Sequence, residues 1–70
     1  MSDGPLEQAA RSAMQRAELL VAGDREAEAL ALLGEALRNS PEHPELLSNY
    51  SWVLNRLNRP TEALEYADRA

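Results

Sequence analysis

The chain has 70 residues, enough for one small domain that buries only about 60% of the surface its unfolded form would expose. It has no cysteine, which excludes disulfides and thiolate metal sites, and its net charge of −5 opposes binding to nucleic acid or anionic lipid. Residues 1–5 show no basic segment followed by an apolar run, and no apolar stretch approaches the roughly 20 residues of a membrane span, so neither a secretory signal nor a membrane helix is expected. We therefore expect a cytoplasmic protein that binds neither nucleic acid nor membrane.

Helical spacing of apolar residues throughout the chain, without strict alternation, predicts an all-α fold. The first helix is expected over residues 5–22, because Pro5 suits a first helical turn. Gly23 is expected to end it in the left-handed conformation, and Asp24 to cap the next helix. The stripe on this helix is rich in alanine and comprises Leu6, Ala9, Ala10, Ala13, Ala17 and Leu20.

A second helix is expected over residues 25–39, where Pro41 disfavours helical geometry in the residue before it. Gly34 inside this helix indicates either close backbone packing or simple tolerance at a solvated position. The apolar stripe comprises Ala29, Leu30, Leu32, Leu33, Ala36 and Leu37.

The third helix is expected over residues 44–57 and the fourth from Pro60 to the last residue. Asn58, which tolerates the left-handed conformation, ends the third helix. This helix has the cleanest amphipathic pattern, with Leu46, Leu47, Tyr50, Val53, Leu54 and Leu57 on one side. In the fourth helix, Leu64 and Ala67 continue the pattern.

A period of 34 residues relates the two halves of the chain. The tripeptide Glu28-Ala29-Leu30 recurs as Glu62-Ala63-Leu64, and Leu20 recurs as Leu54 in the same register. A period of this length marks helical hairpins that bury their faces against one another.

The pattern resembles the tetratricopeptide repeat, whose first helix carries large, leucine and small residues and whose second helix carries a packing alanine. In the second half these positions hold Leu47, Tyr50, Ser51, Leu54 and Ala63, and in the first half Ala13, Ala17, Leu20, Ala29, Leu33 and Pro41. Arg16 and Ala67 depart from the pattern. The two turns are also expected to differ, because Gly23 to Ala29 spans six positions and Asn58 to Ala63 spans five.

The resemblance implies two helix-turn-helix hairpins of antiparallel helices, stacked as a right-handed α-solenoid that uses its concave wall to hold partner peptides. Residues 1–70 then form one domain, with repeat one at about residues 9–42 and repeat two at about residues 43–70. The abrupt end of the last helix at Ala70 suggests a chain cut from a longer array.

On a helical wheel Trp52 lies opposite the apolar stripe of the third helix, on the wall that the family uses for binding. An exposed aromatic with a neighbouring arginine has the composition of a binding hot spot, and the alternative is that the ring packs against the first helix or another chain. The candidate partner-binding residues on this helix are Glu45, Ser48, Asn49, Trp52, Asn55 and Arg56.

In the first repeat, Met14 and Glu18 occupy the corresponding wall. Some family members grip a C-terminal carboxylate there with lysine and asparagine side chains. Only Asn49 agrees with that pattern here, so such a grip is not expected.

We expect no metal site, cofactor or catalytic centre. His43, the sole histidine, has no spaced histidine or carboxylate set around it; with Glu42 and Glu45 it could contact a stray cation, but it is interpreted as a loop residue near a helix start. The serines have no histidine or lysine arranged as a base, and the glycines form no phosphate-binding loop.

The sequence favours a non-enzymatic scaffold that binds a protein or peptide. Two alternatives stay open: a repeat segment of a larger enzyme, such as a glycosyl- or sulfo-transferase, and a self-assembly module. Leu64 and Ala67 lack a following helix to cover them, which suggests a homodimer formed through the C-terminal helix.

Overall fold

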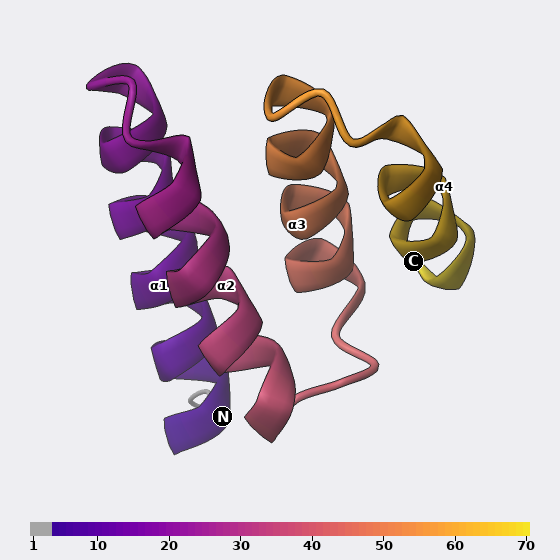
Figure 1. The fold of residues 1–70 in the computed structure, drawn as a ribbon. Coiled ribbons are helices and arrows are strands. Elements are labelled where there is room, and N and C mark those ends of the chain that lie inside the picture. Colours follow the sequence, from indigo (N-terminus) through magenta and orange to yellow (C-terminus); the bar gives the residue numbers. More distant parts are fainter. Residues whose placement is uncertain (1–3) are drawn as a thin grey trace.

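The computed structural model describes residues 4–70 as four helices in two antiparallel hairpins (Figure 1). Helices α1 (Pro5–Ala22) and α2 (Glu26–Asn39) form the first hairpin, and α3 (Pro44–Arg56) and α4 (Pro60–Arg69) form the second. Packing of α3 on α2 joins the hairpins into a flat stack of 39 × 27 × 16 Å. The predicted all-α stack of two hairpins is confirmed. Within residues 4–70, none of the helices is long and apolar enough to cross a bilayer.

The helix bounds lie close to those expected from the sequence. Proline stands at the first position of α1, α3 and α4, where its missing amide proton costs no helical hydrogen bond. Helix α2 begins one residue later than predicted and α3 ends one residue earlier. Local turn chemistry thus defines nearly all of the helical boundaries.

The turn after α1 corrects the predicted roles of Gly23 and Asp24. Asp24 adopts the left-handed conformation, with φ of 60°, whereas Gly23 has φ of −96°. The amide of Arg25 donates to the carbonyl of Leu20 over 2.8 Å, and the amide of Asp24 donates to that of Val21 over 3.0 Å. This pair of bonds is a Schellman motif, which requires its left-handed residue one position beyond the helix cap. Asp24 therefore ends α1 and makes no capping bond to α2.

The turn after α3 has the same construction. Asn58 is left-handed, with φ of 63°. The amide of Arg59 donates to the carbonyl of Leu54 over 2.9 Å, and that of Asn58 donates to Asn55 over 3.0 Å. Because Asp24 and Asn58 are 34 residues apart, the predicted irregularity between the two turns is wrong.

The core lies where α1, α2 and α3 meet. Its buried residues are Ala10, Ala17, Val21, Ala29, Leu33, Leu37, Leu46, Leu47 and Val53. Leu6 and Ala9, which the predicted stripe included, are exposed. Pro44 corresponds to Ala10 in the 34-residue register, so α1 begins five residues earlier than α3.

One contact holds the second hairpin together and another sets how closely it approaches α2. The buried hydroxyl of Ser51 donates to the carbonyl of Ala63 over 2.8 Å, which ties α3 to α4. A Cβ atom added to Gly34 would lie 3.4 Å from Cε1 of Tyr50. This distance favours the close-packing interpretation of Gly34. Burial raises the pKa of Tyr50, whose ring lies 4.6 Å from that of Tyr66.

Candidate binding wall on the third helix

We define the Trp52 wall as the polar face of α3, formed by Glu45, Ser48, Asn49, Trp52, Asn55 and Arg56. Trp52 is 44% exposed, so much of its ring is available to a partner. The guanidinium carbon of Arg56 lies 5.7 Å from the centre of the Trp52 ring. This is the stacking expected one helical turn on, with a cation over the electron-rich face of the indole.

A carboxylate from the first hairpin holds Arg56. The Nη2 and Nε atoms of Arg56 donate to Oε2 of Glu26 over 3.1 and 3.3 Å. Glu26 lies at the start of α2, and its side chain is only 17% exposed. Sequence analysis missed this residue, because a contact across 30 residues depends on how α2 and α3 pack. Glu26 thus orients the arginine that covers Trp52.

Asn49 connects the wall to α1. Its side-chain amide donates to the carbonyl of Glu45 over 2.8 Å and lies 3.2 Å from the sulfur of Met14. The fold therefore brings together two residues that the sequence assigned to the wall from different repeats. Both are half-buried, and this contact gives Asn49 a packing role between α1 and α3.

The other candidates on the wall are exposed. Ser48, Asn55 and Glu18 form no side-chain hydrogen bond with another residue in the described part of the chain. Their side chains are therefore available to a ligand. The sequence-predicted set thus divides into an oriented aromatic–arginine pair, a packed Met14–Asn49 contact and free polar groups.

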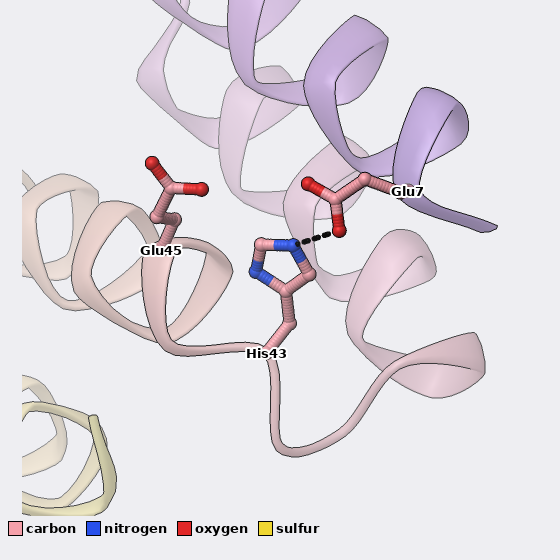
Figure 2. A group of neighbouring side chains, drawn as sticks. All are labelled: Glu7, His43 and Glu45. Atoms are coloured by element: carbon pink, nitrogen blue, oxygen red, sulfur yellow. Dashed lines mark hydrogen bonds and ion pairs between the residues drawn. The ribbon is translucent and has the colours of Figure 1, made fainter. Parts of the chain in front are cut away.

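His43 lies between α1 and α3, where Figure 2 shows its ring directed at Glu7. Its Nδ1 accepts a hydrogen bond from the amide of Leu46 over 3.3 Å, so the imidazole caps α3. Its Nε2 lies 3.0 Å from Oε1 of Glu7. In the neutral ring the proton then resides on Nε2 and is donated to Glu7. The expectation that no carboxylate set surrounds His43 was wrong, since Glu7 approaches from 36 residues away.

Glu45 completes a group of three possible metal ligands with Glu7 and His43, whose ligand atoms all lie within 4.8 Å of one another. Both ring nitrogens of His43 are already hydrogen-bonded in this arrangement. A cation at Nε2 would move the ring proton to Nδ1 and break the cap on α3. The geometry therefore fits a capping and tethering role for His43 better than a ligand role.

Comparison with known proteins supports the repeat architecture. The family model described as tetratricopeptide repeat matches residues 20–70, which include the end of α1, all of α2 and all of the second hairpin. No curated protein and no solved structure matches the chain. The family match thus covers the helix that carries Trp52.

Proposed function

Because the chain belongs to the tetratricopeptide repeat family, whose members generally mediate protein–protein interaction, we propose that it is a non-enzymatic scaffold that binds a peptide or protein on the Trp52 wall. The observation that carries this proposal is the exposed indole of Trp52 beneath an arginine that Glu26 holds in position. Large aromatic and arginine side chains account for much of the binding energy of protein interfaces.

The pair is organised for binding before any partner arrives. An arginine that is free in solution loses side-chain entropy when it is immobilised at an interface, at a cost of about 0.5–1.5 kcal/mol. The two bonds from Arg56 to Glu26 have already restricted it. A partner that packs an apolar group on Trp52 would also remove water from the Arg56–Glu26 pair and strengthen it.

The free polar groups of the wall favour an extended peptide. Ser48 and Asn55 flank Trp52 and offer side-chain donors and acceptors for a peptide backbone. Glu18 and Glu45 add negative charge at the edge of the wall. A peptide with one apolar anchor and adjacent basic residues therefore fits this surface best.

Two further features belong to this proposal: action in the cytoplasm and association with another copy through the last helix. The net charge of −5 supports a protein partner rather than a nucleic acid.

The test uses peptides selected by display against the folded chain. Since Trp52 is the sole tryptophan, its fluorescence reports directly on binding at the wall. We expect Trp52→Ala to weaken a selected peptide by about 2 kcal/mol, or roughly 30-fold, while unfolding free energy changes by no more than about 0.5 kcal/mol. Labelled-peptide anisotropy measures the binding of both proteins.

Leu6→Ala is the matched control, because Leu6 is also a large exposed apolar residue but lies at the start of α1. It should leave peptide affinity unchanged. Loss of stability in Trp52→Ala with unchanged peptide affinity would assign the indole to packing and refute the proposal.

A further inference from the structure

An open groove runs along the face of the first hairpin that points away from the second. It has a volume of about 860 Å³ and lies between α1 and α2. Leu19 lies in it with 75% of its surface exposed. Its lining, which we call the α1/α2 groove, comprises Arg16, Leu19, Leu20, Gly23, Arg25, Glu28, Ala31, Leu32 and Glu35.

The matching face of the second hairpin is occupied by α2. In the 34-residue register Arg16 corresponds to Tyr50 and Leu32 to Tyr66. Both tyrosines pack against the core, and Tyr50 contacts Gly34 of α2. The second hairpin therefore shows that this face of a hairpin packs against a helix.

The two hairpins are alike enough for this comparison. Their turns share the same left-handed position and hydrogen bonds. The Arg25–Glu28 ion pair of the first recurs as Arg59–Glu62 in the second, each with a shortest contact of 2.7 Å. The α1/α2 groove thus has the backbone shape of a face that is known, within this molecule, to accept a helix.

The helix that corresponds to α2 is α4. Leu30 of α2 lines the contact with the second hairpin, and its counterpart in α4 is Leu64, which is 64% exposed. The same molecule therefore carries an unoccupied acceptor groove at one end and an uncovered donor helix at the other.

Charge supports this pairing. Inside the molecule, Gly34 of α2 contacts Tyr50 of the second hairpin. Their counterparts in the 34-residue register are Asp68 of α4 and Arg16 of the groove, so these two side chains would face each other. Neither residue forms an ion pair with another residue among those the structure describes.

A second position follows the same rule. Inside the molecule, Ala31 of α2 and Arg59 of the second hairpin line the same groove. Their counterparts in the 34-residue register are Glu65 of α4 and Arg25 of the α1/α2 groove, which would therefore also lie near each other. Glu65 and Asp68 of α4 would thus both meet arginines, which gives the contact orientation as well as affinity.

We propose that the α1/α2 groove binds α4 of a second copy of this chain, so that copies stack head to tail and continue the internal arrangement of hairpins. The two surfaces are different, so the contact is heterologous and leaves a free groove and a free helix at the ends of every assembly. The expected products are short chains of copies that lengthen with concentration. This differs from the closed homodimer through α4 that the sequence alone suggests, and it does not depend on the Trp52 wall.

The test pairs two variants, one at each surface: Leu19→Glu in the groove and Leu64→Glu on α4. Both leucines are exposed, and circular dichroism should show unchanged helix content. Each variant alone should weaken self-association by about tenfold or more, because an unpaired carboxylate enters an apolar contact. Sedimentation equilibrium from low micromolar to millimolar protein measures this.

Mixing the two variants separates the possible arrangements. The Leu19→Glu protein keeps an intact α4 and the Leu64→Glu protein keeps an intact groove, so the mixture should form a one-to-one complex that grows no further. If the chain instead formed a dimer through α4 of both copies, the Leu19→Glu protein would still dimerise. The mixture would then contain no complex between the two variants. A monomeric parent protein at millimolar concentration would likewise overturn the proposal and leave the groove to another partner.

The predicted ion pair supplies a rescue. Arg16→Asp and Asp68→Arg should each weaken association of the parent chain, and the chain with both changes should regain it, because each contact again joins opposite charges. Failure of the double variant to recover association would contradict the docking register.

Discussion

The two hairpins share one backbone arrangement but carry different residues on corresponding faces. On the second hairpin Tyr50 and Tyr66 pack against α2, whereas their counterparts on the first, Arg16 and Leu32, line an open groove. The turns between the helices are the same in both. The backbone of a hairpin is therefore set by its turn and helix signals. The residues on this face instead depend on whether another helix packs against it.

The first helices of the two hairpins also differ in how they fill the core. Helix α3 contributes leucine and valine side chains with no exposed surface, while the buried positions of α1 before Val21 are all alanine. Helix α3 packs against α1, α2 and α4, so more of its circumference is covered. This contrast predicts that equivalent changes in the two hairpins have unequal effects.

The largest difference is expected between Leu54→Ala and Leu20→Ala, two changes at corresponding positions. Leu54 is fully buried and Leu20 only partly. We expect Leu54→Ala to cost about 3 kcal/mol, because it leaves a cavity, and Leu20→Ala about 1 kcal/mol. Urea unfolding followed by circular dichroism measures both, and equal losses would contradict the asymmetry.

A smaller effect is expected where a hydroxyl distinguishes the hairpins. Ser51→Ala removes the buried bond to the carbonyl of Ala63 and should cost about 1 kcal/mol. The corresponding position, Ala17, is buried without such a bond. The variant Ser51→Thr keeps a hydroxyl at this position, so it should lose less stability than Ser51→Ala if the added methyl group fits. Thermal unfolding is the measurement, and an unchanged midpoint in Ser51→Ala would show that this bond contributes nothing.

The smallest effect concerns the exposed ion pair of the second turn. Hydrogen bonding to Arg59 lowers the pKa of Glu62. The folded chain then binds this proton less readily than the unfolded chain, so the pair favours folding above the ordinary glutamate pKa. That contribution disappears as pH falls through the lowered pKa. An NMR titration should show Glu62 ionising below its usual range and returning to it in Arg59→Ala; identical titrations in both proteins would exclude the interaction.

Much of the fold is accessible from sequence because its signals are local. Pro44 and Pro60 begin helices, and Asn58 takes the left-handed conformation that its side chain tolerates. The turn residues assigned wrongly were Gly23, chosen for glycine's freedom, and Asp24, expected to cap α2. The 34-residue register would have aligned Asp24 with Asn58 and identified the correct position.

The candidate site was only partly accessible. Helical periodicity alone places Trp52 on the polar face of α3 and Arg56 one turn away, and both features agree with the structure. Periodicity could not show that Asn49 packs on Met14 or that Glu26 holds Arg56. These contacts join different helices, and their geometry depends on the distance and angle at which the helices pack.

The sequence by itself determined four helices, two hairpins and the period that relates them, because apolar spacing and turn residues act within a few positions of one another. Only the tertiary structure decided that Glu7 reaches His43, and that the first hairpin leaves a groove open while the second is filled by α2. Each of these results depends on residues that lie on different helices. Such residues meet only after the helices have packed, so no local pattern records their contact.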